Sequence, residues 1–481
     1  MLTMLWRWAQ QEQDKTALIH MDQKFTYGRL FSLRCRLTKF LSRHKFKTSG
    51  VAVILGDTLL DDWLLSAALR SMGLDTVCPK SLEQLRLMSL RNLSVIVLGE
   101  DFSRTSTIPH EFFGVPRILV PGSSVRAADG VSDAGIIPTS VWGGHMLITT
   151  GTTGAPKAVL YKGSQEDIRN EVRALHFGFT RDTVYFASNF PLYTAVGFKN
   201  PAATWHKGGT VVIDTQPYDA PVNLPDNISS TVLIPASIEQ FARSPRVSDR
   251  VRQNVTVRLS GGFLSANTWQ QVRKLFGSPI EVYFASSEIS GIMLRSQVSS
   301  TDQLTWLQPD RNRVIDIVDE AGNTCDVGVE GELRVGLTEL DPIGYVGDAA
   351  SSAKTFRDGY YYPGDLAVRR ADGRIRVLGR LNDVINVMGH KVAAAPIEQA
   401  IQEALGLSEV CVFSGPDEAG NDRIVVACRR SEPLTETEIS TVNTLLQWLG
   451  PTQIVQLSEF PLSSGAMQKT DRRALRKLVF G

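Results

Sequence analysis

The sequence predicts an α/β protein with a large N-terminal domain and a smaller α+β domain behind it. Three observations lead to this fold class: the length, the alternation of strand and helix patterns in the first part, and the loss of that alternation in the last part. At 481 residues the chain is too long for one ordinary hydrophobic core. We therefore expect a large body and at least one further domain.

The first part of the chain alternates short β-rich runs with helical patterns. Apolar residues between Leu30 and Leu41 recur at three- and four-residue steps, which predicts a helix capped near Thr26. The β-rich run GVAVILGD follows, and then a second helical pattern, LLDDWLLSAALRSMG, which Gly73 closes. SVIVLGE and PRILVPG repeat the strand pattern. Such alternation indicates largely parallel or mixed sheets flanked by helices.

The last part of the chain shows strand patterns bounded by turns. They occur in GELRVGL, in GYYYPGDLAVRRADGRIRVLGR with its turn at Asp372-Gly373, and in LSEVCVFSG and DRIVVACRR. These patterns predict antiparallel pieces at the end of the large domain and a compact α+β unit after it. The expected domains are residues 1–380 and 381–481, with a boundary between Arg380 and Asp383.

Charge and cysteine usage exclude several classes of function. Lys+Arg 51 against Asp+Glu 50 leaves a formal net charge of +1, so no broad basic face for nucleic acid is expected. The cysteines show no CxxC pairing, which argues against a zinc site or a disulfide framework and predicts reduced, mostly buried thiols. They are Cys35, Cys78, Cys325, Cys411 and Cys428. The start lacks a signal-peptide pattern, and no stretch approaches the ~18 apolar residues of a membrane span, so we expect the cytoplasm.

The stretch LITTGTTGAPKAVLY, residues 147–161, carries the clearest chemistry. An apolar strand leads into a loop with two glycines, four threonines and one lysine, and another apolar strand follows. Glycines let backbone N–H groups approach an anion, threonine hydroxyls donate hydrogen bonds, and Lys157 supplies charge. The loop predicts a phosphate-binding site, but not a Walker loop, because no Gly-Lys-Ser/Thr closes it. A polar hairpin turn is the alternative.

This loop resembles the signature of the superfamily of acyl- and aryl-CoA synthetases, adenylation domains and luciferases. These enzymes activate a carboxylate with ATP to an acyl adenylate. The resemblance covers nearly the full chain and implies an acyl-CoA synthetase-like fold with a small mobile C-terminal domain. By this resemblance Thr152 is a catalytic residue. The residues of the loop assigned to ATP or AMP are Thr149, Thr150, Gly151, Thr153, Gly154 and Lys157.

A second motif, YFASSEISG, resembles the family's aromatic-Gly-x-Thr-Glu element. The resemblance assigns Phe284 to adenine stacking, Ser287 to the threonine position and Glu288 to the magnesium-side carboxylate, with Ala285 in place of glycine. A hard cation that bridges ATP phosphates needs such an oxygen ligand. Taken alone, a buried glutamate at a strand edge such as Glu288 is more often structural.

The long stretch YYPGDLAVRRADGRIRVLGRLNDVINVMGHK resembles the family over its whole length. The resemblance implies that Asp365 holds the ribose hydroxyls and Arg380 the ribose-phosphate side, the alternatives being a turn aspartate and a surface arginine. It implies a domain hinge at Asn382, where the family usually has Asp or Lys. VMGHKV resembles the loop that faces the acceptor tunnel, with Gly389 and Lys391.

Two stretches bear on the acid. NFPLYTAVGF resembles the family's Pro-Leu-Phe-His element and places Tyr193 and Thr194 in the acid pocket, with Thr194 in place of the histidine. It lacks the Phe-Asp-x-Ser pattern of amino-acid-activating domains. RLSGGFLS resembles the Gly-Gly element between the two pockets, which assigns Gly262 to the nucleotide and Gly261 and Phe263 to the acid. Phe263 favours a compact or aromatic acid, unless the ring simply packs in the core.

The last motif, KTDRRAL, places Lys469 where the family has its catalytic lysine. Upstream the sequence departs from the family, because Gly465 lies four residues before the lysine and the stretch from Pro461 is about two residues longer. A two-residue insertion in a hairpin keeps the side-chain face, since the strand period is two. A solvated basic tail is the alternative reading of this segment.

The resemblance implies ATP and Mg²⁺ as cofactors and a small carboxylic acid as substrate. We expect attack of the carboxylate on the α-phosphate, release of pyrophosphate and transfer to a thiol. No carrier domain follows the lysine in this sequence, so coenzyme A or a separate acyl carrier protein is the expected acceptor. Two alternatives remain: a nucleotide-binding homologue that has lost catalysis and serves regulation or assembly, and an adenylating enzyme with an oxygen or amine acceptor.

Overall fold

The computed structural model describes most of the chain, in two compact units. The described residues are 2–21, 23–105, 112, 114–122, 142–150, 155–188, 190–213, 224–244, 247, 251–262, 264, 266–277, 280–300, 302–387, 390–416, 422–450, 452–462 and 470–480. The first unit comprises Met1–Val232, Ser286–Gly291 and Thr338–Phe356. The second comprises Leu233–Ala285, Ile292–Leu337 and Arg357–Gly481.

The first unit contains a six-stranded sheet that is parallel except at one edge. Its order is β6 (Arg117–Val120), β5 (Leu93–Gly99), β3 (Val51–Leu55), β4 (Asp75–Val77), β7 (His145–Thr150) and β8 (Pro156–Tyr161). Only β7 and β8 pair antiparallel, as a hairpin. The predicted strands of the first part are therefore confirmed, and the hairpin brings the threonine-rich motif to the end of a buried strand.

A second sheet of this unit combines strands from distant parts of the chain. The strands are β11 (Ser230–Leu233), β9 (Val184–Ser188), β10 (Thr210–Ile213), β1 (Thr16–His20) and β2 (Gln23–Thr26). Neighbours are parallel except β1 and β2. Parallel neighbours require crossover connections, and the chain supplies one in helix α8 between β9 and β10.

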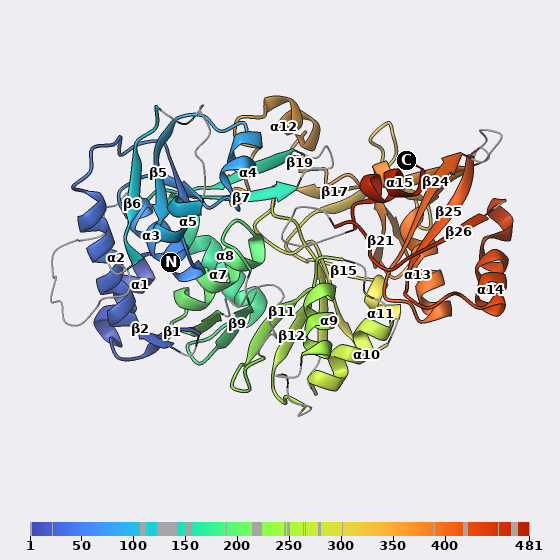
Figure 1. The fold of residues 1–481 in the computed structure, drawn as a ribbon, viewed down its shortest axis with the longest axis horizontal. Helices are drawn as coiled ribbons and strands as arrows, with labels where there is room; N and C mark the ends of the chain where they lie inside the picture. The colour runs from blue at the N-terminus through green and yellow to red at the C-terminus, as the bar shows by residue number, and fades with distance from the viewer. Residues whose placement is uncertain are drawn as a thin grey trace. The chain divides into compact units, whose positions relative to one another are not determined.

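The helices of the first unit surround these sheets (Figure 1). They are α1 (Leu2–Gln11), α2 (Tyr27–Leu41), α3 (Leu59–Ser71), α4 (Leu82–Leu87), α5 (Glu100–Thr105), α7 (Glu166–Phe177), α8 (Ala195–His206) and α12 (Ala349–Thr355). The predicted cap of α2 is confirmed, since the Thr26 hydroxyl accepts from Arg29 N at 3.2 Å. Gly73, at φ +91°, follows α3 in the left-handed region that favours glycine.

The second unit begins with a mixed sheet and continues with an antiparallel one. In the first, β12 (Thr256–Leu259) pairs parallel with β13 (Ile280–Phe284), and β14 (Leu294–Val298) and β15 (Gln308–Pro309) continue antiparallel. Its helices are α9 (Pro235–Arg243), α10 (Ala266–Leu275) and α11 (Asp302–Thr305). The antiparallel sheet contains β16 (Ile315–Val318), β17 (Glu330–Gly336), β18 (Phe356–Arg357), β19 (Tyr360–Tyr361), β20 (Asp365–Arg369) and β21 (Ile375–Arg380). The predicted antiparallel pieces are thus confirmed.

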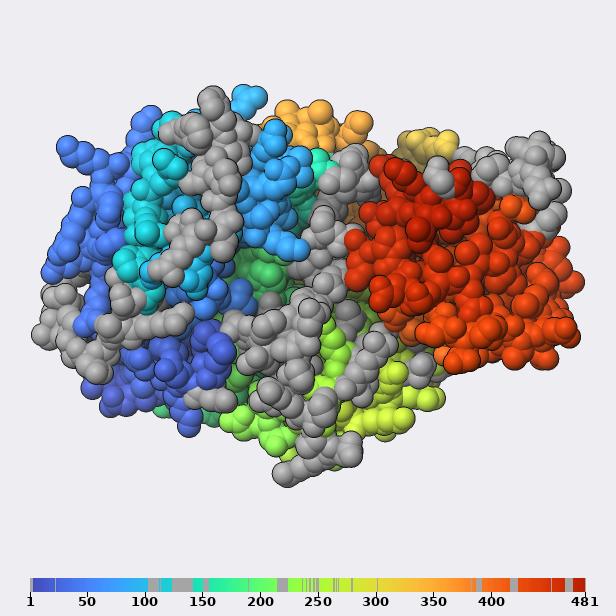
Figure 2. Space-filling view, viewed as in Figure 1, coloured from blue at the N-terminus to red at the C-terminus, as the bar shows by residue number. Residues whose placement is uncertain are grey.

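The last hundred residues form an α+β arrangement with apolar clusters of its own. The hairpin of β22 (Val384–Val387) and β23 (His390–Ala393) leads into α13 (Ala394–Leu405). The sheet β24 (Val410–Pro416), β25 (Asp422–Arg429) and β26 (Thr452–Leu457) follows with α14 (Glu436–Leu446) and α15 (Arg472–Phe480). One buried cluster draws all its members from 385–449 and the other from 411–475. Figure 2 shows this orange-to-red stretch as one continuous mass.

Four of the five cysteines are buried, in agreement with the prediction, and Cys325 is half-buried. Of the helices that the structure describes, none has both the length and the apolar composition needed to span a bilayer.

Candidate functional site

The threonine-rich motif occupies the β7–β8 hairpin. Thr149 pairs with Lys157 across the two strands, and Thr150 pairs with Pro156. The side-chain oxygen Oγ1 of Thr149 is buried and has no hydrogen-bond partner among the described residues. A buried hydroxyl of this kind is costly unless something binds it, so it points to a ligand at the end of β7. The remaining motif residues, Gly151, Thr152, Thr153 and Gly154, lie outside the described part, as does the Thr150 side chain.

A cation, an aromatic ring and a carboxylate lie in a row beside this hairpin. The Lys157 ammonium is 5.0 Å from the centre of the Tyr345 ring, and the Tyr345 hydroxyl donates to Glu288 Oε1 at 3.0 Å. The second carboxylate oxygen accepts from the Ser286 hydroxyl. Glu288 is 7% exposed. The three side chains therefore combine positive and negative charge at the place where an anion-binding loop would begin.

Tyr345 owes its place to pairing between strand β8 and a segment far along the chain. Tyr345 and Val159 form an antiparallel bridge, and Val346 N donates to Ala158 O at 2.8 Å. These contacts lie within the first unit. This pairing fixes the position of Tyr345 beside the hairpin. The tyrosine side chain can therefore contact both Lys157 and Glu288.

The predicted ribose-binding pair lies in the second unit. Asp365 begins β20 and pairs across the sheet with Arg380, the last residue of β21. Arg380 Nε is 3.4 Å from Asp365 Oδ1, and a second guanidinium nitrogen donates to Pro363 O. Asp365 is buried, whereas the Arg380 side chain is 41% exposed. The pair thus presents a carboxylate and a partly open cation that match the two assigned contacts.

The other assigned residues of the second unit lie at strand ends or just after them. Phe284 is the half-buried last residue of β13. Gly261 and Gly262 follow β12, and Gly261 has φ +90°, a conformation that favours glycine. Phe263 lies outside the described residues. Ser287 belongs to the first unit, where its carbonyl oxygen accepts from the hydroxyl of Tyr161 at 2.7 Å.

Thr194, assigned to the acid pocket, is the N-cap of α8. Its hydroxyl accepts from Gly197 N at 3.0 Å and donates to Pro191 O at 2.7 Å. Tyr193 beside it is buried, and its carbonyl oxygen accepts from Ile148 N at 2.8 Å. The hydroxyl that replaces the family's histidine is therefore engaged in helix capping.

His145 attaches the same segment to strand β7. Its Nε2 is 3.0 Å from Leu192 O, and its Nδ1 is 2.9 Å from the Thr76 hydroxyl oxygen. A carbonyl oxygen only accepts, so Nε2 carries the proton and Nδ1 accepts from threonine. Burial, followed by the charge of Arg70, lowers the pKa of His145 to about 3. The imidazole is therefore neutral in the folded protein.

This depressed pKa should make the protein less stable in mild acid. The unfolded chain takes up a proton near pH 6.5, while the folded chain resists protonation of His145 until about pH 3. The free energy of unfolding should therefore fall by about 1.4 kcal/mol per pH unit below pH 6 from this residue alone. His145→Gln keeps one donor and one acceptor but does not titrate. Urea unfolding from pH 7.5 to 5 should show a shallower pH dependence in the variant, and parallel curves would refute the assignment.

The hinge, tunnel and lysine positions are only partly described. Asn382 is the central residue of a 3-10 turn, Leu381–Asp383. Lys391 pairs with Asn386 in the β22–β23 hairpin. The side chains of Asn382 and Lys391 lie outside the described part, and so do Gly389 and Lys469 entirely.

The residues on either side of the lysine segment are fixed. Leu462 and Thr470 form an antiparallel bridge, and Asp471 N donates to Pro461 O at 2.7 Å. Helix α15 begins at Arg472, directly after this pairing. Lys469 therefore directly precedes a paired residue.

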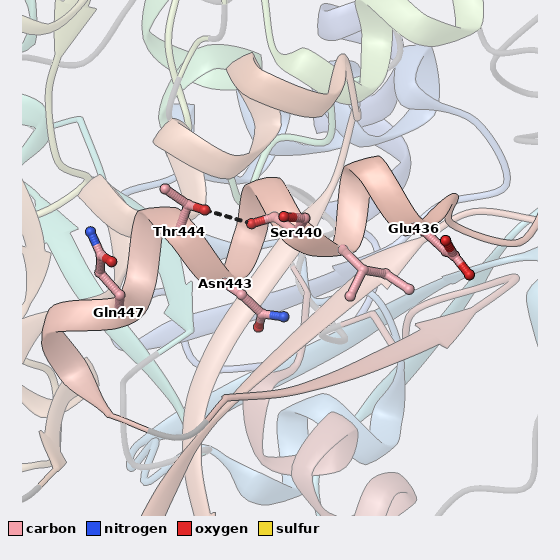
Figure 3. Close-up of a pocket in the computed structure, with 6 residues that line it drawn as sticks. Glu436, Ser440, Asn443, Thr444 and Gln447 are labelled. Atoms are coloured by element: carbon pink, nitrogen blue, oxygen red, sulfur yellow. Dashed lines mark hydrogen bonds between the residues drawn. The ribbon is translucent and has the colours of Figure 1, made fainter.

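A shallow hollow lies along helix α14, and none of the assigned residues lines it. Its volume is about 430 Å³, and it is lined by Glu436, Ile439, Ser440, Asn443, Thr444 and Gln447. Figure 3 shows the Thr444 hydroxyl donating to the Ser440 carbonyl oxygen, at 2.8 Å. The remaining lining groups are one glutamate, two amides and an isoleucine on an exposed helix face. The lining residues include no cation that could bind a phosphate.

Sequence reasoning missed two residues at the centre of the site, Tyr345 and Lys199. Lys199 is buried in α8 and contacts the carbonyl groups on both sides of Glu288. The signals were a lone lysine in the apolar run TAVGFKNPAATWH and the Gly-Tyr pair in DPIGYVG. Neither is distinctive without a structure.

Comparison with known proteins agrees with this geometry. Residues 145–339 match the family model for AMP-binding enzymes. The chain is 28% identical over 355 residues to a 2-hydroxy-7-methoxy-5-methyl-1-naphthoate–CoA ligase of Streptomyces carzinostaticus. That alignment covers 69% of this chain and 61% of the ligase. The chain therefore spans less than two thirds of this relative.

Two solved structures share the fold over almost the whole chain. The anthranilate CoA ligase AuaEII in complex with anthranoyl-AMP has a TM-score of 0.81 at 17% identity, with coverage of 99% of this chain and 96% of that one. The amide bond synthetase McbA from Marinactinospora thermotolerans has the same TM-score and identity, with coverage of 99% of both chains. At such identity the likeness establishes the fold, which agrees with the fold class predicted from the sequence.

Proposed function

Because the chain belongs to the superfamily of AMP-binding, adenylate-forming enzymes, we propose that it activates a carboxylic acid with ATP. The acid's carboxylate attacks the α-phosphorus, the bond to the bridging oxygen breaks, and acyl-AMP and pyrophosphate form. A thiol then takes the acyl group, AMP leaves, and the thiol proton is released. The observation that carries this proposal is the row of Lys157, Tyr345 and Glu288 beside the threonine-rich hairpin.

The residues of the first unit fit the phosphates of ATP and a magnesium ion. The orphaned hydroxyl of Thr149 and the ammonium of Lys157 offer a donor and a positive charge to phosphate oxygens. The Glu288 carboxylate is the oxygen ligand that would hold Mg²⁺, a hard cation. When bound, Mg²⁺ neutralises charge on the phosphates. Glu288 itself is oriented by two hydroxyl donors, Tyr345 and Ser286, so its position does not depend on the metal.

Further roles in nucleotide binding are proposed for residues of the second unit and of the C-terminal motif. We assign Asp365 to the ribose hydroxyls, Arg380 to the ribose-phosphate side and Phe284 to the adenine. The buried carboxylate next to a partly open guanidinium supports the first two roles. Lys469 would place its ammonium between the acid's carboxylate and the α-phosphate, where charge develops during attack.

We propose residues 1–380 and 381–481 as the two functional domains, hinged at Asn382. The separate apolar clusters after residue 384 support a C-terminal part with its own core. The turn Leu381–Asp383, between β21 and β22, supports a hinge there. Gly389 and Lys391 would then border the path of the thiol.

For the acid we propose a small or aromatic carboxylate. The assigned pocket residues are Tyr193, Thr194, Gly261 and Phe263, a set with two aromatic rings and no ammonium-binding carboxylate. A naphthoate–CoA ligase among the relatives is consistent with this choice. ATP–pyrophosphate exchange across aryl, short acyl and β-amino acids tests the proposal. Exchange with aryl acids is expected, and ATP binding without exchange on any acid would refute the function.

The acceptor is proposed to be coenzyme A or the phosphopantetheine of a separate carrier protein. Mass spectrometry of free acyl-CoA and of a candidate carrier protein separates the two. The fold shared with an amide bond synthetase makes an amine acceptor worth including in the same assay. We propose the cytoplasm as the compartment, since free thiols such as the five cysteines persist there.

A further inference from the structure

A lysine lies buried in helix α8, in a stretch of small and apolar residues. Lys199 is 8% exposed. Its Nζ is 2.8 Å from the hydroxyl oxygen of Tyr161 and 2.8 Å from the carbonyl oxygen of Ile289. The carbonyl oxygen of Ser287 is the third partner, at 3.4 Å. An ammonium group has three donors, and this arrangement uses all of them.

The two carbonyl groups stand on either side of Glu288. The Tyr161 hydroxyl adds a second bond at the first of them, because it also donates to Ser287 O. One residue further on, Asp341 Oδ1 accepts from the N–H and the hydroxyl of Ser290, at 2.6 and 2.8 Å. The main chain around the carboxylate is thus held by side chains from strand β8, helix α8 and the segment before α12.

Side-chain contacts determine the position of the segment Ser286–Gly291, because of the way this segment is connected along the chain. Ser286–Gly291 belongs to the first unit, whereas β13 before it and β14 after it belong to the second. The covalent chain alone therefore does not set the distance from Glu288 to Lys157. Hydrogen bonds within the first unit do.

We propose that Lys199, assisted by Tyr161, is a positioning residue that sets the place of the Glu288 carboxylate in the nucleotide site. The inference rests on the function proposed above. Lys199 binds neither ATP nor the metal; it acts through the main chain on both sides of the glutamate. An apolar side chain of similar length would fill the same space but would leave the carbonyl groups of Ser287 and Ile289 without this donor.

The cost of burying a lysine amine argues that Lys199 does more than fill space. Burial, followed by the charge of Arg173, lowers the pKa of Lys199 well below its ordinary value, whereas Asp341 and Glu288 raise it. Burying an ammonium costs several kcal/mol unless it is well paired. The three oxygen partners offset that cost, and two of them are the carbonyls beside Glu288.

Three variants distinguish a role of Lys199 in positioning Glu288 from a role in packing alone. Lys199→Met removes the ammonium at similar length, and Tyr161→Phe removes only the hydroxyl that supports Ser287. Thr204→Val is the matched control, since it removes a buried hydrogen bond of the same helix, from Thr204 Oγ1 to Asn200 O at 2.9 Å. All three are examined as the full chain.

Two readouts are independent of turnover. Hydrogen exchange of a peptide covering 286–291 should become about tenfold faster or more in Lys199→Met, because the hydrogen bonds from Lys199 Nζ to this segment are lost. Binding of Mn²⁺ with ATP, followed by electron paramagnetic resonance, should weaken by roughly 10 to 100-fold. In pyrophosphate exchange the half-saturating Mg²⁺ concentration should rise by the same factor, with the KM for the acid much less affected. Tyr161→Phe should change these values in the same direction by less, and Thr204→Val should lower stability only.

The proposal is overturned if Lys199→Met keeps the parent's hydrogen exchange and Mn²⁺ affinity within about twofold, well short of the loss expected for an outer-shell partner. Should Lys199→Met fail to fold, Tyr161→Phe decides in the same way. If the parent shows no pyrophosphate exchange with any acid, the proposed function fails, but the exchange of 286–291 and the Mn²⁺ titration still decide the role of Lys199.

Discussion

Replacing Lys469 with alanine should slow formation of the acyl adenylate by roughly 10² to 10³-fold. The reason is electrostatic: a positive group between the attacking carboxylate and the α-phosphate stabilises charge that develops only in the transition state. The measurement is ATP–pyrophosphate exchange at saturating ATP and acid. The antiparallel bridge between Leu462 and Thr470 supports the assignment, because it fixes the residue that directly follows Lys469.

The control for this variant is a neighbouring charge with no assigned role. Lys477 is exposed on α15, so Lys477→Ala should leave the exchange rate unchanged. Arg472 is unsuitable, because its guanidinium donates to Glu398 Oε1 and to Val412 O, both at 2.6 Å. Normal exchange in Lys469→Ala would show that the longer stretch after Pro461 has moved the lysine out of the site.

The basic tail shows where sequence reasoning stops. A solvated basic tail was the alternative reading of this segment, and Arg473, Arg476 and Lys477 are indeed exposed. Arg472 differs: although burial opposes it, the Glu398 carboxylate raises the pKa of Arg472 above its ordinary value. Its partner lies 74 residues earlier in the chain. No local pattern distinguishes one arginine of such a run from the next.

Elements with strong local signals were predictable. The cap at Thr26, the glycine after α3 and the turn at Asp372-Gly373 were all placed correctly, because each depends on a few adjacent residues. The parallel pairing of β25 with β26 was not foreseen. A helix, a turn and about twenty residues separate these strands, and nothing in either strand specifies its neighbour.

The residues of the candidate site also fall into those that the sequence identified and those that it did not. Motif resemblance singled out Thr149, Lys157 and Glu288, whose placement together in the first unit supports the assignment. The sequence analysis did not identify Tyr345 and Lys199, since their roles depend on the residues that they contact and not on the spacing of a motif. A tyrosine after glycine and a lysine in an apolar helix are common patterns with many explanations.

Replacing Glu288 with glutamine should reduce pyrophosphate exchange by roughly 10² to 10³-fold, since the change removes the charge that would hold the cation but keeps the shape. The amide fits the existing contacts: its oxygen accepts from the Tyr345 hydroxyl, and the Ser286 hydroxyl can turn to accept from its N–H₂ group. The free energy of unfolding should therefore change little. Binding of Mn²⁺ with ATP should weaken in parallel with activity.

Tyr345→Phe separates the charge of Glu288 from its orientation. It leaves the carboxylate and removes one donor, so its effect should be smaller, at roughly tenfold in metal affinity. Glu320→Gln, at an exposed carboxylate, should have no effect. If Glu288→Gln lowered stability but left exchange and Mn²⁺ affinity at parent values, the glutamate would be a structural residue at a strand edge. The cation would then have to be held by other oxygens, and Lys199 would have no carboxylate to position.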